Sequence, residues 1–312
     1  MSVRKASHAG SWYSSSKAQL SSQLDGWLNA VSAPVKCIGA VSSSGEPVAE
    51  LPVPRARVII APKRVFLLGP SHHFYLSKCA LSKHTAYETP LGNLPIDRET
   101  TEELYASKQF QWMSKSVDEE EHSLEMHLPY IYKVLSLNFS DEASFPKLVP
   151  IMVGNTTAST EKSFGQLLAP FLADPGNAFV ISSDFAHWGL RFRYTYYDPS
   201  PANETGSSTE PYSLKQSDSA PTKPAIHESI RKVDFQCIDA CESGSHAEWL
   251  DVLERTGNTV CGRHPIGILM AAVEALEERD KGKFRFVRYE RSSEVKRIDD
   301  SSVSYASAFA VV

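Results

Sequence analysis

The chain has 312 residues, of which 42% are hydrophobic and 22% are charged, and its formal net charge is -5. This size allows one large domain or two ordinary ones, and the composition is that of a globular protein. The small negative charge excludes the basic footprint of a nucleic-acid-binding protein, and the lack of a run of about 18 apolar residues excludes a transmembrane span.

The N-terminal sequence and the cysteine content predict the location of the protein in the cell. Residues 1–8 lack the apolar stretch of a secretory signal peptide. The five cysteines are odd in number and not closely spaced, which fits free thiols in a reducing compartment. We therefore expect a cytoplasmic protein, with the nucleus left open as a second location.

The first predicted elements are an irregular segment, a helix and a loop. His8, Trp12 and Tyr13 stand among small residues. They either rim a site or, as we favour for the two larger aromatics, anchor the N-terminus. Apolar residues recur with helical spacing at 16–31, whereas 32–54 is rich in Ser, Gly, Pro and Val and indicates a loop.

Two strand-like runs, 57–61 and 65–68, follow each other too closely. Both are apolar enough for the buried middle of a parallel sheet. Parallel neighbours need a crossover of about a dozen residues, and only three residues separate these runs. Either the runs form a hairpin or a bent strand, or a crossover element is absent from this chain.

A glycine and a proline end the second run, and His72 and His73 follow. Ligands and catalytic groups collect at the carboxyl ends of strands in open α/β sheets. Two imidazoles at this position indicate a metal or acid–base site, and the alternative is a loop with two partly exposed histidines. A strand at 79–82 and a helix at 98–106 come next.

An acidic run leads into His122, Glu125 and His127. On a helix, His122 and Glu125 share a face, whereas His122 and His127 do not. Glu and His at such spacing can bind metal, although a solvated, capped helix start is the alternative. A strand at 148–154 and an amphipathic helix at 160–173 follow.

A further buried strand, 178–181, ends in small polar residues and then Asp184, His187 and Trp188. An aspartate near a histidine can orient the ring and raise its basicity, and the alternative is an aspartate that caps a turn. Because this is the second polar cluster at a strand end, we favour one shared functional site.

The last third of the chain begins with a polar segment, 198–224, rich in Pro, Ser and Thr, which predicts a flexible insertion. Residues 225–256 follow a helical pattern, and 284–290 and 303–312 indicate strands.

Cys261, Arg263 and His264 stand just before a helix that we expect from Pro265 to about Glu278. The helix dipole and the arginine favour a thiolate there, which suits a reactive thiol or a soft metal ligand. A buried, inert cysteine is the alternative.

Six segments, in order along nearly the whole chain, resemble the MEMO (mediator of cell motility) family. They are 7–13, 68–73, 121–130, 182–189, 261–267 and 300–306. The resemblance implies one α/β domain over 1–312, with a central mixed or parallel sheet flanked by helices, as in the catalytic subunit of class III extradiol dioxygenases.

The resemblance also implies a cleft. By motif match, His72 and Cys261 are metal ligands, and His187 matches the acid–base histidine of the dioxygenases, with Asp184 beside it. The other expected cleft residues are His8, Trp12, Tyr13, His73, His122, Glu125, His127, Trp188, Arg263 and His264.

Iron or copper is the metal that the family implies, but this chain departs from the family motif. The family has Ala-Pro-His-Ala-Gly-Tyr and a crossover helix after the first strand, whereas Ala61-Pro62 is followed here directly by Lys63. The apparent deletion, from a splice form or a wrongly joined gene model, removes the other metal histidine. We therefore expect weak iron or copper binding.

The function implied is that of a binding protein in signalling to the cytoskeleton and cell motility and in metal or redox homeostasis, with phosphotyrosine peptides bound in the same cleft. The competing class is an iron-dependent, oxygen-using oxidoreductase with His187 as acid–base. The cysteine ligand and the lost histidine both argue against ring cleavage. A third alternative is a poorly folded domain, because a lost central strand exposes sheet edges.

Overall fold

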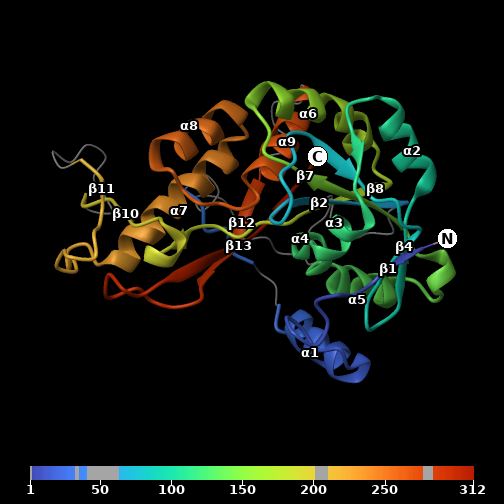
Figure 1. The fold of residues 1–312 in the computed structure, drawn as a ribbon, viewed down its shortest axis with the longest axis horizontal. Helices are drawn as coiled ribbons and strands as arrows, with labels where there is room; N and C mark the ends of the chain where they lie inside the picture. Colours follow the sequence, from blue (N-terminus) through green and yellow to red (C-terminus); the bar gives the residue numbers. More distant parts are fainter. Residues whose placement is uncertain (1, 32–34, 41–62, 201–209, 277–283) are drawn as a thin grey trace.

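A five-stranded mixed sheet lies at the centre of the computed structural model, which describes residues 2–31, 35–40, 63–200, 210–276 and 284–312 (Figure 1). Strand β2 pairs in parallel with both β7 and β8, whereas β3 runs antiparallel to β7. The predicted α/β class with a central mixed sheet is therefore confirmed. The strands, in sheet order, are β6 (Gln111–Trp112), β3 (Cys79–Leu81), β7 (Lys147–Val153), β2 (Arg64–Pro70) and β8 (Asn177–Ile181).

Strand β2 separates two hydrophobic cores. Phe66 and Leu68 belong to one buried cluster, and Val65 and Leu67 belong to another. Successive side chains of a strand point to opposite faces of the sheet, so both faces of β2 are covered. This explains why the run reads as continuously apolar rather than alternating.

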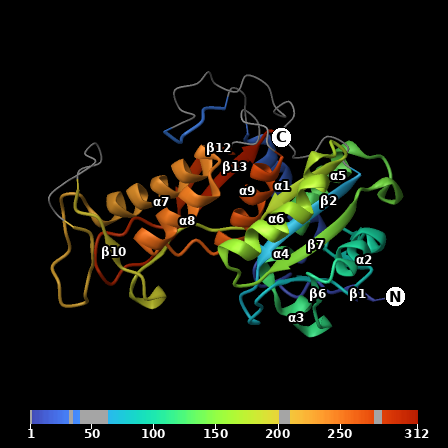
Figure 2. The same cartoon turned by 90° about the horizontal axis from the view of Figure 1, so that it is seen from above.

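Each face of the sheet is covered by helices. The core that contains Phe66 includes side chains of α6 (Ala158–Ala173) and α9 (Arg263–Ala275), and the other core includes side chains of α1 (Lys17–Asn29) and α5 (Leu128–Asn138). Figure 2 shows α6 beside α9. A Cβ on Gly165 would lie 2.7 Å from the Ala271 backbone, so glycine permits this close contact.

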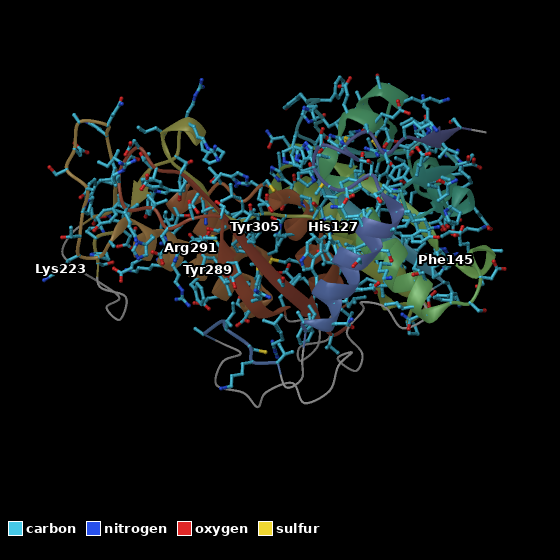
Figure 3. All side chains as sticks on the ribbon, turned by 90° about the horizontal axis from the view of Figure 1, so that it is seen from below. His127, Phe145, Lys223, Tyr289, Arg291 and Tyr305 are labelled. Carbon is cyan, nitrogen blue, oxygen red and sulfur yellow. The ribbon has the colours of Figure 1, made fainter. Side chains whose placement is uncertain are left out.

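A second sheet joins the C-terminal strands to the loop after β8. Strand β13 (Ser302–Ala310) pairs antiparallel with β12 (Phe284–Arg291) and with β9 (His187–Trp188). Figure 3 shows Tyr289, Arg291 and Tyr305 along this sheet. The remaining elements are β1 (Val3–Arg4), β4 (Ala86–Glu88), β5 (Asn93–Pro95), β10 (Tyr196–Tyr197), β11 (Tyr212–Ser213), α2 (Arg98–Ala106), α3 (Lys115–Glu120), α4 (His122–Glu125), α7 (Ile226–Ser243), α8 (His246–Thr256), η1 (Glu142–Ser144) and η2 (Leu190–Phe192).

Most predicted elements are present, and the largest differences lie in the C-terminal helices. The helical pattern at 225–256 is divided into α7 and α8, because Gly244 ends α7 at φ 75° and the Ser245 side chain caps α8 by accepting the Glu248 N–H. Helix α9 begins at Arg263, two residues earlier than predicted, and ends at Ala275, about three residues before the predicted end. None of the helices in the described ranges is long and apolar enough to cross a lipid bilayer.

Several predictions fall on residues outside the described ranges. These include most of the loop at 32–54, the strand at 57–61 and the middle of the insertion at 198–224. The junction before Lys63 lies at the edge of the described part, so the deletion stays a prediction. Both edges of β2 are already paired, and β2 therefore offers no free edge for a hairpin partner.

Candidate functional site

The candidate site lies where β2 ends and α4 begins beside it. His72 follows two residues after β2. The Ser123 hydroxyl on α4 donates to the Pro70 carbonyl oxygen at 2.7 Å. A Cβ on Gly69 would lie 2.7 Å from that hydroxyl oxygen, so only glycine lets α4 approach the strand this closely.

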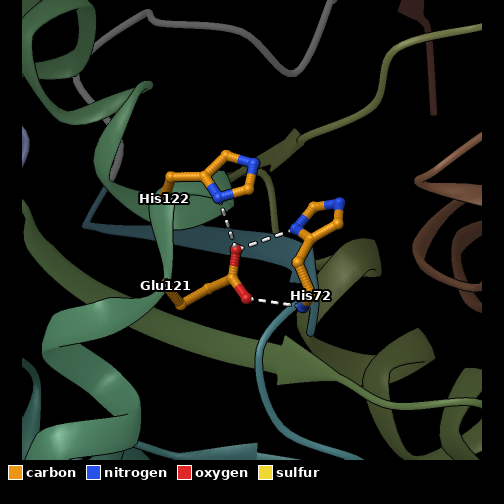
Figure 4. A group of neighbouring side chains, drawn as sticks. All are labelled: His72, Glu121 and His122. Carbon is orange, nitrogen blue, oxygen red and sulfur yellow. Dashed lines mark hydrogen bonds and ion pairs between the residues drawn. The ribbon is translucent and has the colours of Figure 1, made fainter. Parts of the chain in front are cut away.

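Glu121 joins His72 and His122 (Figure 4). Its Oε1 lies 2.9 Å from His72 Nδ1 and 3.5 Å from His122 Nδ1. The carboxylate also accepts the backbone N–H of His72 at 2.6 Å and of Ser123 at 2.9 Å. Burial raises the pKa of Glu121, but these hydrogen bonds outweigh it and lower the pKa to about 2. The carboxylate is therefore ionised and fixed in place.

His122 stands at the centre of a group of aromatic rings. Its ring centroid lies 4.4 Å from that of His72, 4.6 Å from Trp12 and 5.6 Å from His73, and His8 closes the group at 6.1 Å. Burial and the nearby charge of His72 lower the pKa of His122 to about 4, so this imidazole is neutral at pH 7. Trp12 is 55% exposed and its ring lies against that of His122, and its role as an anchor of the N-terminus stays a prediction.

Glu125 holds the N-terminal segment through hydrogen bonds. It accepts hydrogen bonds from Arg4 Nη1 at 2.7 Å, the His8 N–H at 2.8 Å and the Tyr13 hydroxyl at 2.8 Å. Tyr13 is therefore an anchor. No described contact joins Glu125 to His122, because the buried carboxylate is already engaged by the arginine and the N-terminal segment.

Cys261 meets His72 from the loop before α9. Burial lowers the pKa of His72, but hydrogen bonds with Cys261 and Glu121 outweigh it and raise the pKa to about 10. The Asp184 N–H donates to the Cys261 Sγ at 3.1 Å, and the Cys261 N–H donates back to the Asp184 carbonyl oxygen at 3.2 Å. The structure thus brings together the two residues expected as metal ligands.

His187 lies next to Asp184, with Nε2 3.9 Å from the Asp184 Oδ2. The His187 Nδ1 faces the carbonyl oxygens of Phe185 at 3.0 Å and Thr259 at 3.2 Å. Since carbonyl oxygens only accept, Nδ1 carries the hydrogen in the neutral ring and Nε2 is left as the basic nitrogen. This arrangement suits an acid–base group.

Asp234 on α7 binds both loops of the site. It is fully buried and accepts hydrogen bonds from the Ala186 N–H at 3.1 Å, Asn258 Nδ2 at 3.0 Å and the Tyr289 hydroxyl at 2.8 Å. Burial raises the pKa of Asp234, while its hydrogen bonds oppose that change. One carboxyl group therefore ties both site loops to the C-terminal sheet.

Two of the expected cleft residues have other roles. Trp188 is 1% exposed and donates its indole N–H to the Tyr196 carbonyl oxygen at 2.9 Å, so it is a core residue rather than a cleft residue. Burial lowers the pKa of His127 to about 4. His127 lies at the N-terminus of α5 without a side-chain cap bond, and no described contact joins it to the His72 group.

His264 also points elsewhere, to a second polar group. Its Nδ1 lies 2.7 Å from the Glu161 Oε1 and its Nε2 2.9 Å from the Asn155 Oδ1. The same carboxylate binds His246 Nε2 at 2.6 Å. The neighbouring Arg263 accepts the buried Trp249 indole N–H on its carbonyl oxygen. No described contact joins His264 to the His72 group, and its assignment to the cleft stays a prediction.

Glu121 and Asp234 are the residues that the sequence did not single out. Glu121 ends an acidic run that reads as a solvated face, yet it is 1% exposed. Its signal is positional, because the Glu121 side chain caps α4 by accepting the Ser123 N–H. Asp234 lies in the middle of a long helical pattern and carries no local signal.

Comparisons with known proteins agree over the whole chain. A family model described as "Memo-like protein" matches residues 4–309. "Protein MEMO1" of Danio rerio is 40% identical over 319 aligned residues, covering 100% of this chain and 98% of the relative. "Protein MEMO1" of Homo sapiens is 40% identical, covering 97% and 95%, and "Protein memo-1 homolog" of Caenorhabditis elegans is 37% identical, covering 98% and 81%.

A solved structure of an uncharacterized Escherichia coli K12 protein aligns with a TM-score of 0.42 at 13% identity, covering 79% of this chain and 87% of that one. At this TM-score the likeness supports no conclusion about this chain.

Proposed function

Because the chain belongs to the Memo-like protein family, as its full-length match shows, we propose that it is a cytoplasmic signalling protein acting on the cytoskeleton and cell motility. Its cleft binds a phosphotyrosine-containing segment of a partner protein. The family membership confirms the expected kinship and α/β fold, and the residues around His122 support the binding role.

The single observation that carries the proposal is the exposed ring of Trp12 beside a group of imidazoles. An indole that is 55% exposed and flanked by His8 and His122 offers a face on which a tyrosine ring can stack. Imidazole N–H groups donate hydrogen bonds, which a phosphate with its acceptor oxygens requires.

An arginine stands near the other end of the site. Phe192 packs edge-on against His187 at 5.3 Å, and the exposed Arg191 guanidinium lies 4.4 Å above the Phe192 ring. Guanidinium groups recognise phosphate through paired hydrogen bonds. A peptide across the site would therefore meet an aromatic platform at one end and a cation at the other.

Fluorescence anisotropy with a labelled phosphotyrosine peptide and its unphosphorylated twin tests this proposal. We expect Trp12→Ala to weaken binding about tenfold, from the loss of about 1–2 kcal/mol of aromatic contact. Trp27→Ala is the matched control, because Trp27 is 53% exposed on α1 and stacks on Tyr130. Equal affinity for the two peptides, or equal effects of the two tryptophan variants, would refute the proposal.

We also propose that the cleft binds iron or copper weakly. His72 and Cys261 would hold the metal, and Glu121 fixes His72 in the manner of a carboxylate beside a metal-bound histidine. A bound metal would supply redox chemistry. Two ligands from a family set of three make an incomplete site, so we expect less than stoichiometric iron or copper after purification, measured by elemental analysis.

An iron-dependent oxidoreductase remains the second candidate. The basic Nε2 of His187 beside Asp184 favours it, because this pair could accept a proton from a catechol. Oxygen consumption with a panel of catechols tests this role. Turnover of a catechol by the wild-type chain that is lost in His187→Ala would favour the oxidoreductase function over the peptide-binding function.

A further inference from the structure

We propose that a cavity between the two sheets binds one straight alkyl chain with an uncharged head group, as in a long-chain alcohol. The cavity has a volume of about 270 Å³ and lies between β8, α9 and the strands β12 and β13. The inference goes beyond the proposed function, because the described residues that line this cavity include neither His72 nor Trp12.

The edge of strand β8 forms one wall of the cavity. Among the strands that the structure describes, β8 pairs with β2 alone. Residues 179–181 of β8 all line the cavity, although successive side chains of a strand point to opposite faces. Strand β8 therefore presents its unpaired edge, and not one of its faces, to the cavity.

Small side chains of β13 create the space opposite β8. Ala306, Ala308 and Ala310 line the cavity, and they share one face of β13 because they occupy alternate positions. A methyl group reaches less far from the strand than the leucine, isoleucine and phenylalanine side chains that fill the rest of this core. The gap between the two sheets thus follows from the sequence of β13.

Larger apolar side chains complete the cavity. Helix α9 contributes Ile266, Leu269 and Val273, and β12 contributes Phe284 and Phe286. Pockets lined mainly by such side chains bind ligands through apolar contact. A cavity of about 150 Å³ with an apolar lining is already large enough to bind benzene. The lining and the volume therefore favour a hydrocarbon group over a polar ligand.

The shape of the cavity favours a chain over a ring system. Ala306 and Ala310 both line it, and their spacing along β13 separates them by about 13 Å. A volume of about 270 Å³ spread over this length leaves a mean cross-section of about 20 Å². Carbon atoms in contact stand about 3.5–4.0 Å apart, so such a section accommodates one chain of methylene groups.

The polar groups of the lining indicate an uncharged head group. Among the described lining residues, Ser183 carries the only hydroxyl, and none has a charged side chain. The Ser183 hydroxyl is already engaged, because it donates to the Asp184 carbonyl oxygen at 2.8 Å and accepts the Gly262 N–H at 3.1 Å. No cation on this lining would attract a carboxylate. Ala308 is exposed, so the cavity opens to solvent there and the head group can stay hydrated.

Titration of the full chain with decanol, followed by the methyl resonances in carbon–proton correlation spectra, tests the inference. We expect shifts for the methyl groups of Ile181, Ile266 and Leu269, which line the cavity. The methyl groups of Ile96 and Ile131 should not shift, because they lie in the core on the other face of the central sheet. Octanol should bind about tenfold less tightly than decanol, because burial of each methylene strengthens binding by about fourfold.

A substitution that fills the cavity should displace the ligand. We expect Ala306→Leu to weaken decanol binding by about tenfold or more, because the added carbon atoms occupy the space of the chain. Ser307→Leu is the matched control, because Ser307 is the next residue of β13, is exposed and points to the opposite face. Circular dichroism establishes whether both variants fold.

Three outcomes would overturn the inference. The first is a wild-type chain whose cavity methyl groups do not shift with decanol, which would assign the space to other residues of the chain or to a second copy. The second is equal affinity for adamantanemethanol, a compact cage with the same head group, and the third is undiminished decanol binding by folded Ala306→Leu. The wild-type shifts and the comparison with octanol decide even if Ala306→Leu fails to fold.

Discussion

Gly69 controls how closely α4 approaches the end of β2, and Gly69→Ala tests that control. The added methyl would lie 2.7 Å from the Ser123 Oγ and 3.0 Å from the Leu124 Cδ2. Comfortable contacts are about 3.5–4.0 Å, so α4 must retreat by about 1 Å. Overpacking of this kind costs about 1–3 kcal/mol, and the same movement separates Glu121 from His72.

Equilibrium urea denaturation followed by circular dichroism measures the change in the free energy of unfolding. We expect Gly69→Ala to lower it by about 2 kcal/mol. Gly26→Ala is the control, because Gly26 is an exposed residue of α1 with no atom within 4 Å of the added Cβ. That change should raise the free energy of unfolding by about 0.5–1 kcal/mol.

The double variant Gly69→Ala with Ser123→Ala isolates the cause. Removal of the Ser123 hydroxyl relieves the shortest clash. The double variant should therefore lose less free energy of unfolding than the sum of the two single losses, by about 0.5–2 kcal/mol. Additive costs, or a Gly69→Ala chain as stable as the wild type, would refute the argument that α4 is held against the strand by this contact.

Three further predictions concern buried carboxyl groups and the thiols. Asp234→Ala removes the carboxylate that accepts hydrogen bonds from the Ala186 N–H, the Asn258 amide and the Tyr289 hydroxyl, and should lower the free energy of unfolding by about 3 kcal/mol, with a smaller loss for Asp234→Asn, measured by urea denaturation. Burial raises the pKa of Glu161, but hydrogen bonds from its two histidines outweigh it and lower the pKa. The stabilisation is therefore complete above the unfolded pKa of about 4.3 and is lost as the pH falls through the lower folded value. The stability advantage of wild type over Glu161→Gln should shrink between about pH 5 and pH 3; an advantage that does not change there would contradict this. Burial raises the pKa of the three buried thiols, so mass spectrometry after brief alkylation of the native chain should find label only on the partly exposed Cys37 and Cys261; labelling of a buried thiol would count against the fold of that core.

The hydrophobic pattern predicts most of the helices and strands, because each of them packs an apolar face or edge into a core. The run at 65–68 became the central strand, and the helix at 98–106 has the predicted bounds. The helical pattern does not predict the break between α7 and α8, since a single glycine within such a pattern is often tolerated. Its positive φ and the serine cap that follows decide the break, and both depend on the backbone rather than on periodicity.

The sequence predicts where the site residues lie in the fold, but it does not predict which of their side chains form hydrogen bonds or ion pairs. Strand ends placed His72, Asp184 and His187 near one another, because the carboxyl ends of parallel strands share an edge. The sequence could not show that Glu125 pairs with Arg4, 121 residues away, or that Glu121 is buried. The sequence pattern does not distinguish buried acidic residues from exposed ones, because their burial depends on the tertiary fold.

The central place of β2 has a consequence for hydrogen exchange. Its amides bond to neighbours on both edges, and its side chains lie in two separate cores. Such amides exchange with deuterium only when the whole domain opens. His72, two residues beyond the strand, is thus attached to the slowest-exchanging part of the molecule. The exposed indole of Trp12 belongs to the N-terminal segment, so the two sides of the cleft should differ widely in their opening rates.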